Sequence, residues 1–302
     1  MGGRPGVVVE ERKTVGLFQQ LLLFLELIKF PHTIFALPFA FAGAVLAAQG
    51  IPQGAKILWI LVAMVGARTG AMAVNRLVDM DLDALNPRTA HRALPRGLIR
   101  PLLVLAIAIL SFAVLVFAAA QLNRLCLLLS PVAIGLTVLY SYTKRLTSSS
   151  HLILGLCLAC APIGAWIAVR GEVNLPPLVL GLAVLFWVAG FDILYALADI
   201  DFDRAHGLYS IPARVGSKAA MQVSLLCHTA VPVLLGIVGQ LLHLGPLYYL
   251  GLLFVVGLLG YEHATLRRHG LVRLETAFFN VNGVISITFF AFTLLDALPI
   301  LS

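Results

Sequence analysis

The chain has 302 residues, of which 60% are hydrophobic and 12% are charged, and Lys and Arg outnumber Asp and Glu by 21 to 14. Soluble domains carry about 25% charged residues, so this composition and a mean hydropathy of +0.98 exclude an ordinary soluble enzyme and a disordered chain. A membrane span needs about 20 mostly apolar residues. The sequence therefore predicts an all-α polytopic membrane protein that contacts the lipid bilayer, and we expect no nucleic-acid partner.

Apolar stretches follow one another along the chain and predict a bundle of about nine transmembrane helices. Turn residues or charges separate the stretches, as at Gly50 to Pro52, at Asn86 and Pro87, and at Gly245 and Pro246. The predicted spans cover residues 20–48, 55–78, 99–119, 123–142, 150–169, 177–199, 219–240, 246–265 and 275–298. We expect residues 1–302 to form a single integral membrane domain.

The basic residues predict the orientation of the bundle. Sixteen of the 21 Lys and Arg residues fall on one side of the predicted spans and three on the other, while Arg68 and Arg76 lie inside the second span. Loops rich in Lys and Arg face the cytoplasm. We therefore expect a multi-pass protein of the cell (inner) membrane, with the N-terminus and the basic loops in the cytoplasm.

Two acidic motifs end predicted spans: motif one covers residues 75–83 and motif two covers residues 192–203. Within each motif polar residues recur at every fourth position, which places them on one helix face. These faces carry Asn75, Asp79 and Asp83 in motif one and Tyr195, Asp199 and Asp203 in motif two, whereas Asp81 and Asp201 point elsewhere. The matching aspartates lie 120 residues apart with four spans between them. Both motifs therefore lie on one membrane side, and two parallel, pseudo-repeated halves can face each other across a cavity.

Four carboxylates at one cavity repel one another unless cations balance their charge. Two divalent cations would balance them, and ligation by oxygen alone suits Mg²⁺, which takes one or two carboxylates together with substrate phosphates. The two motifs therefore predict a Mg²⁺ site for a diphosphate ligand. The plainer interpretation, a solvated helix cap, explains one motif but not two with the same spacing on the same side.

Basic residues near both motifs fit the same ligand, because Lys and Arg bind phosphate oxygens. Tyr140, Lys144 and Arg145 follow one another at the end of the fourth predicted span. Arg68 lies in the middle of the second span, on the face that carries Asn75 and Asp79. An arginine within the membrane indicates a functional site as the first hypothesis. Two interpretations of Arg68 stay open: it pairs with Asp79, or it binds an anionic group of a substrate.

The combined pattern resembles that of the UbiA-type intramembrane prenyltransferases. The matching segments are motif one with Asn86-Pro87-Arg88-Thr89 and Arg92 to Gly97, motif two, and Tyr140 with Lys144-Arg145, in the family's order. Many members carry Asp directly after the first Asn, where this chain has Arg76. With this departure the chain resembles the branch that prenylates 4-hydroxybenzoate, which is itself similar to enzymes that prenylate dihydroxynaphthoates for menaquinone.

The resemblance implies an enzyme that moves a polyprenyl group from polyprenyl diphosphate to an aromatic acid in quinone biosynthesis, with Mg²⁺ as cofactor. It implies that the metal and diphosphate are held by Asn75, Asp79, Asp83, Asp199 and Asp203. These four aspartates and Asp192, which would orient or deprotonate the phenol, are the predicted catalytic residues. The predicted substrate-binding residues are Asn75, Arg68, Arg76, Lys144, Arg145, Tyr140 and Tyr195.

The acceptor and two other classes of protein stay open at this point. Prenylation of a dihydroxynaphthoate is the alternative acceptor reaction. A secondary transporter would also show intramembrane charge and two repeated halves, although it more often carries its charges near the midplane. A structural membrane subunit would tolerate replacement of the paired aspartates.

Overall fold

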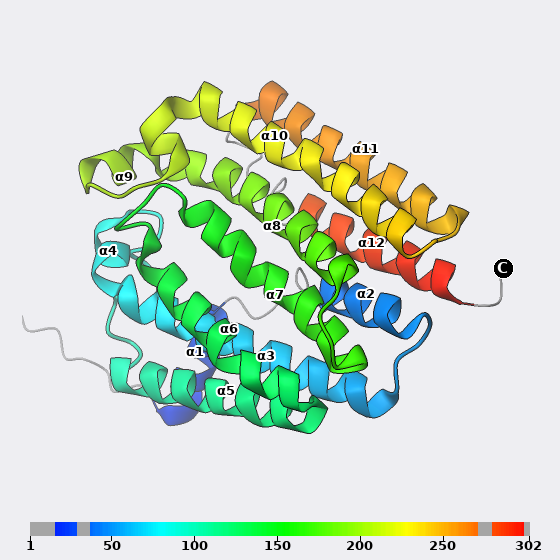
Figure 1. Ribbon diagram of the computed structural model, residues 1–302. Helices are drawn as coiled ribbons and strands as arrows, with labels where there is room; N and C mark the ends of the chain where they lie inside the picture. Colours follow the sequence, from blue (N-terminus) through cyan, green and yellow to red (C-terminus); the bar gives the residue numbers. More distant parts are fainter. Residues whose placement is uncertain (1–15, 29–36, 271–279, 299–302) are drawn as a thin grey trace, which may run out of the picture.

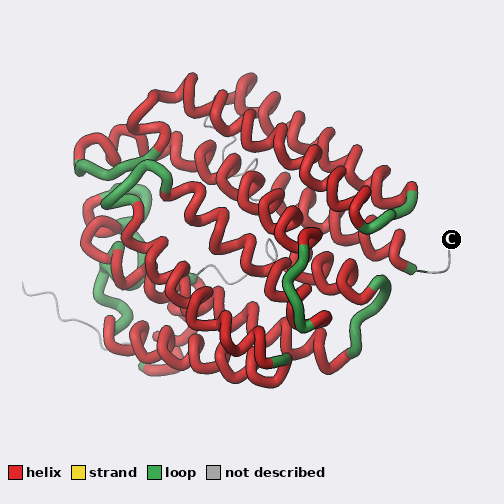
Figure 2. Tube along the Cα trace, viewed as in Figure 1, coloured by secondary structure: helices red, strands yellow, loops and turns green. Residues whose placement is uncertain are grey.

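The computed structural model describes residues 16–28, 37–270 and 280–298, and this part of the chain is helical without any strand (Figure 2). The helices of the first half are α1 (Leu17–Leu27), α2 (Leu37–Ala48), α3 (Gly54–Val78), α4 (Met80–Leu85), α5 (Pro101–Leu122) and α6 (Arg124–Thr143). Those of the second half are α7 (Ser150–Arg170), α8 (Leu175–Tyr195), the 3₁₀ turn η2 (Ala196–Asp199), α9 (Ile200–Ala205), α10 (Ile211–Leu241), α11 (Pro246–His269) and α12 (Asn282–Ala297).

Seven helical stretches are long and apolar enough to cross a membrane: α3, α5, α6, α7, the continuous stretch Leu175–Ala205, α10, and Pro246–Arg268 of α11. The shorter helices α1, α2 and α12 are also apolar. The predicted all-helical polytopic fold is thus confirmed. The predicted span 20–48 covers most of α1 and all of α2. Its residues 29–36 lie outside the described part, as do residues 275–279 of the last predicted span.

The largest difference from the predicted boundaries is at α10, which begins at Ile211 rather than at residue 219. Ser210 caps this helix, because its hydroxyl accepts a hydrogen bond from the amide of Ala213 at 3.2 Å, and Pro212 occupies its first turn. Such residues favour a helix start. The backbone then kinks at Gly216, where φ is +80°. The apolar pattern alone did not reveal this first turn.

Helices α7 and α8 run side by side through the middle of the bundle, between α3 and α5 on one side and α10 and α11 on the other (Figure 1). The largest apolar core joins α8 to α2, α10, α11 and α12, and buries Trp187, Tyr248 and Phe289 completely or nearly so. Gly155 lets α7 approach α8 closely, since a Cβ atom there would collide with the carbonyl oxygen of Leu185. Small residues commonly permit such contacts between membrane helices.

Both acidic motifs interrupt their helices at a matching aspartate, and in motif two the 3₁₀ turn η2 precedes it. The backbone leaves the helical conformation at Asp79 (φ −91°, ψ 5°) and at Asp199 (φ −108°, ψ 9°). A six-residue helix follows each break, α4 after Asp79 and α9 after Asp199. Both short helices lie at the same end of the bundle, on the left in Figure 1. The predicted repeat in the sequence is therefore also a repeat in backbone conformation.

Candidate active site

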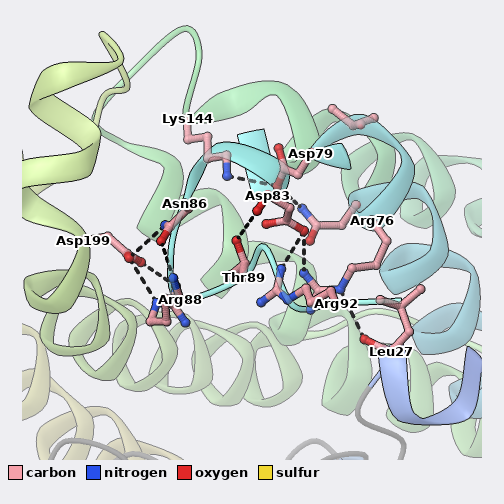
Figure 3. Close-up of polar contacts among 12 residues, drawn as sticks. Leu27, Arg76, Asp79, Asp83, Asn86, Arg88, Thr89, Arg92, Lys144 and Asp199 are labelled. Atoms are coloured by element: carbon pink, nitrogen blue, oxygen red, sulfur yellow. Dashed lines mark hydrogen bonds and ion pairs between the residues drawn. The ribbon is translucent and has the colours of Figure 1, made fainter. Parts of the chain in front are cut away.

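The first carboxylate of motif one is surrounded by donors from two helices. Figure 3 shows its contact with Lys144. Asp79 is 4% exposed. Its Oδ2 atom lies 3.0 Å from Nζ of Lys144, at the end of α6, and accepts a hydrogen bond from Nδ2 of Asn75 at 3.1 Å. Arg145 lies 3.5 Å from Oδ1. The structure thus brings together four predicted site residues, and the nearly buried carboxylate faces two cations.

The second carboxylate of motif one, Asp83, is also buried and lies between two arginines. Its Oδ2 atom is 2.7 Å from Arg92 and 3.9 Å from Arg76 (Figure 3). Nε of Arg76 also donates to the carbonyl oxygen of Leu27 at the end of α1. Arg76 is 8% exposed and therefore joins α1 to Asp83. Its predicted contact with a substrate stays a prediction.

Motif two is tied to the first half of the chain by the loop after α4. Arg88 contacts Asp199 with Nε at 3.0 Å and with a second nitrogen at 2.5 Å, and donates to the hydroxyl of Tyr195 at 2.8 Å. Asn86 adds a hydrogen bond from Nδ2 to Asp199 at 3.2 Å, while its Oδ1 accepts from the amide of Arg88 (Figure 3). Burial alone lowers the pKa of the Arg88 guanidinium, but its contacts with Asp199 and Tyr195 outweigh burial and raise it above the ordinary value. Arg88 therefore stays charged.

The two remaining predicted carboxylates form no ion pair with Lys or Arg among the described residues. Asp203 accepts a hydrogen bond from the hydroxyl of Ser210 at 2.7 Å. Asp192 lies 2.7 Å from Nδ1 of His151, at the start of α7. By contrast, Asp81 and Asp201 are exposed, as their helical phase predicted. The structure therefore separates the aspartates that face the site from those that do not.

An apolar cavity of about 350 Å³ extends from the motif end into the bundle. Asn75 and Tyr140 line it near the motifs, and Leu122 and Cys126 line it far from them. Its walls come from α3, α5, α6 and α7 and are mostly aliphatic side chains, including those of Met64, Leu115, Ala119, Leu129, Ala133 and Leu158. Such a lining accommodates a long hydrocarbon chain.

Arg68 is the charged residue of this cavity wall. Among the described residues, no carboxylate forms an ion pair with it and no acceptor receives a hydrogen bond from its side chain. The described contacts therefore contain no pair between Arg68 and Asp79, which was one of the two predicted alternatives. A guanidinium in an apolar cavity without a protein partner calls for an anionic ligand, since an unpaired buried charge is costly.

The donor set at the motif end fits Mg²⁺ chemically, because it consists of carboxylate and amide oxygens. Within the described residues, no three side chains of His, Cys, Asp or Glu converge closely enough to hold a metal on their own. Mg²⁺ usually binds one or two carboxylates and completes its shell with water and substrate phosphates. The arrangement thus fits an ion that binds together with a phosphate-bearing ligand.

Sequence reasoning did not assign three of these contacts. Arg88 and Arg92 are named above only as parts of the segments that match the family, with no partner carboxylate assigned. His151 was not singled out at all. The available signal was a titratable residue at the start of a predicted span, which is unusual enough in membrane proteins to mark a functional site.

An all-helical membrane bundle with two acidic motifs at the end of an apolar cavity is the architecture of an intramembrane transferase for a lipid with an anionic head. The model of the UbiA prenyltransferase family matches residues 36–284, so the chain belongs to this family. The predicted resemblance and the prediction of a transferase are thereby confirmed. Family membership favours this enzyme over the transporter and the structural subunit.

Similar proteins include a 4-hydroxybenzoate octaprenyltransferase of Aeromonas salmonicida, which is 31% identical over 258 residues, covering 84% of this chain and 88% of the relative. The apo structure of a UbiA homolog from Aeropyrum pernix K1 is 36% identical, with a TM-score of 0.82, and the match covers 89% of this chain and 98% of that one. A UbiA homolog from Archaeoglobus fulgidus bound to DMAPP and Mg²⁺ shares the fold, with 18% identity, a TM-score of 0.65 and coverage of 91% and 98%.

Proposed function

We propose that the chain transfers a polyprenyl group from polyprenyl diphosphate to the ring of an aromatic acid, 4-hydroxybenzoate first, in a Mg²⁺-dependent reaction of quinone biosynthesis. The name of the Aeromonas salmonicida relative supports this acceptor. The DMAPP and Mg²⁺ bound to the Archaeoglobus fulgidus homolog support the donor and the metal. We also infer that residues 1–302 act as one domain of the inner membrane, with the motif end in the cytoplasm.

The donor's diphosphate is proposed to bind at the motif end. Asn75, Asp79, Asp83, Asp199 and Asp203 would hold Mg²⁺ there, and the bound metal would stabilise the negative charge that develops on the diphosphate. Lys144 and Arg145 lie beside Asp79 and can donate to phosphate oxygens. The polyprenyl tail would then extend along the apolar cavity past Tyr140.

The observation that carries the proposal is Arg68, an unpaired guanidinium in the wall of that apolar cavity. A polyprenyl tail offers no anion, so the partner of Arg68 must come from the second substrate. A carboxylate on an aromatic ring satisfies Arg68 and leaves the apolar ring against the aliphatic wall. Because Arg68 lies two helical turns from Asn75 on α3, the ring would lie close to the reacting end of the donor.

In this geometry the chain's own residues hold the two reactants together. The allylic C–O bond breaks, its electron pair leaves with the diphosphate, and a carbon of the electron-rich ring forms a bond to the allylic carbon. Basic side chains placed where charge develops on the leaving group lower the barrier. The aliphatic cavity excludes water, which protects the allylic carbon from hydrolysis.

The proposal is tested with purified protein in lipid vesicles, prenyl diphosphates of several lengths and two acceptors, 4-hydroxybenzoate and a dihydroxynaphthoate. We expect mass spectrometry to detect prenylated 4-hydroxybenzoate, with turnover lost on chelation of Mg²⁺ and restored on its return. Product from the dihydroxynaphthoate alone would transfer the assignment to the menaquinone reaction. Absence of both products, with intact protein, would contradict the proposal.

We expect the far end of the cavity to limit the length of the prenyl chain that the enzyme accepts. Ala119 lines this end with a 4% exposed side chain, so Ala119→Phe should fill it. We expect kcat/KM for an octaprenyl donor to fall at least 10-fold, because forcing a tail into a filled site costs about 1–3 kcal/mol. The value for a geranyl donor should change little, because its short tail does not reach this end. The matched control is Ala120→Phe, because Ala120 is exposed on the outer side of α5. Equal losses for both donors would contradict a tail at this end.

A further inference from the structure

The hydrogen bonds of His151 define its protonation state. His151 is 3% exposed, and its Nε2 accepts a hydrogen bond from the backbone amide of Ile211 at 3.3 Å. A backbone amide only donates, so Nε2 carries no proton. The ring proton therefore lies on Nδ1 and is donated to Oδ2 of Asp192 at 2.7 Å. The pair consists of a neutral imidazole and a carboxylate that accepts from it.

Contacts from two other helices, α8 through Asp192 and α10 through Ile211, fix the ring in this orientation. Ile211 belongs to the first turn of α10, which Ser210 caps, and Ser210 also donates to Asp203 of motif two. The close approach of α7 and α8 at Gly155, one turn beyond His151, brings the ring to Asp192. The position of His151 thus depends on motif two, α8 and α10 together. Such contacts from outside the reacting groups often determine the precision of a catalytic site.

Asp192 differs from three of the other carboxylates at the motif end. Asp79, Asp83 and Asp199 each contact at least one Lys or Arg, whereas no ion pair joins Asp192 to such a cation within the described residues. A cation beside a carboxylate favours its charged form and makes it a poor proton acceptor. A neutral imidazole holds the carboxylate in place without adding charge.

Asp192 is also placed to meet the acceptor. Its side chain is 20% exposed, whereas that of His151 is 4% exposed, so one carboxylate oxygen is available on the open side of the pair. It lies on α8 one turn before Tyr195, which contacts Arg88, and within electrostatic reach of Tyr140 in the cavity wall. Asp192 therefore lies at the start of motif two, near the Tyr140 end of the cavity in which the aromatic acid is proposed to bind.

We infer that His151 is a positioning residue that holds Asp192 as the proton acceptor for the phenolic hydroxyl of the aromatic substrate; this inference rests on the proposed function. The phenolic proton passes to Asp192 as the ring carbon bonds to the allylic carbon and the C–O electron pair leaves with the diphosphate. The resulting dienone tautomerises, its ring C–H proton passes to the oxygen through water, and Asp192 releases one proton per turnover.

The inference is tested with His151→Leu, His151→Gln and Asp192→Asn in the vesicle assay. We expect His151→Leu to lower kcat about 10- to 100-fold, less than the roughly 10²–10⁴-fold that a general base contributes, because Asp192 itself is retained. The KM for the prenyl diphosphate should stay unchanged. His151→Gln should recover most of kcat, because its amide also donates to Asp192. The kcat of the double variant, His151→Leu with Asp192→Asn, should be no lower than that of the worse single variant, as expected for residues that act as a unit.

Two further measurements separate positioning from a purely structural role. The phenol of 2-fluoro-4-hydroxybenzoate ionises more readily, so with this acceptor the loss of kcat in His151→Leu should be smaller. The rise in Tm on adding geranyl diphosphate with Mg²⁺ reports donor binding, and it should be the same in wild type and His151→Leu. Three results would overturn the inference. They are a wild-type kcat in His151→Leu, a folded His151→Gln variant whose kcat is not restored, and a loss of kcat in His151→Leu that is the same with the fluorinated acceptor. If wild type prenylates no aromatic acid, the proposed function fails instead.

Discussion

Alanine at Asp79 or Asp199 is expected to lower prenyl transfer by about 10²–10³-fold, the loss seen when one group that stabilises developing charge is removed. Each variant would also leave cations without their carboxylate: Lys144 and Arg145 beside Asp79, and Arg88 beside Asp199. The loss should appear mainly in kcat, because the affected interaction strengthens as the diphosphate leaves. Initial rates at saturating donor and Mg²⁺ measure it.

The chain offers matched controls for this experiment. Asp81 and Asp201 belong to the same motifs, lie two residues beyond Asp79 and Asp199, and are exposed. We expect Asp81→Ala and Asp201→Ala to keep wild-type rates. Full activity in Asp79→Ala and Asp199→Ala, or equal losses in all four variants, would show that the assignment of the site is wrong.

The second large effect is expected at Arg68. Arg68→Met keeps most of the apolar stem but removes the charge, so the acceptor's carboxylate would lose its partner in the cavity wall. Hydrogen bonds to charged groups contribute about 1.5–3 kcal/mol, which corresponds to a fall of about 10- to 150-fold in kcat/KM for 4-hydroxybenzoate. The same constant for the prenyl diphosphate should change little.

A neutral acceptor distinguishes recognition of the carboxylate from general damage. With 4-hydroxybenzamide, which lacks the carboxylate, wild type and Arg68→Met should react at similar rates. Arg124→Met is the matched variant, because Arg124 is an exposed arginine at the start of α6, and it should react like wild type with both acceptors. An equal loss of Arg68→Met on both acceptors would contradict the role proposed for Arg68.

The helices were predictable because the membrane requires long apolar segments and the breaks between them carry Pro, Gly or charge. The separation of Asp79 from Asp81 and of Asp199 from Asp201 followed from helical phase. The break at Asp79 and Asp199 did not follow, since a spacing of four residues is equally compatible with an uninterrupted helix. A backbone hydrogen bond from the amide of Asp83 to the carbonyl of Asp79 survives the break, at 2.7 Å.

Pairs between distant segments could not be predicted. Arg88 and Asp199 are separated by 111 positions, and His151 and Asp192 by 41. Whether such residues meet depends on how helices are shifted and rotated against one another, which the apolar pattern of a single helix does not record. The same limit applies to Arg76, since its sequence position did not reveal that it turns toward Leu27.

The position of α6 at the edge of the bundle has a consequence for release of the product. One face of α6 lines the cavity with Leu129, Ala133 and Tyr140, while Leu128 and Leu139 on the helix are exposed. Between the occupied cavity and the surrounding acyl chains there is thus a wall one helix thick. Once the diphosphate has departed, the alkylated ring carries no phosphate anchor, and we expect it to diffuse sideways past α6 into the bilayer.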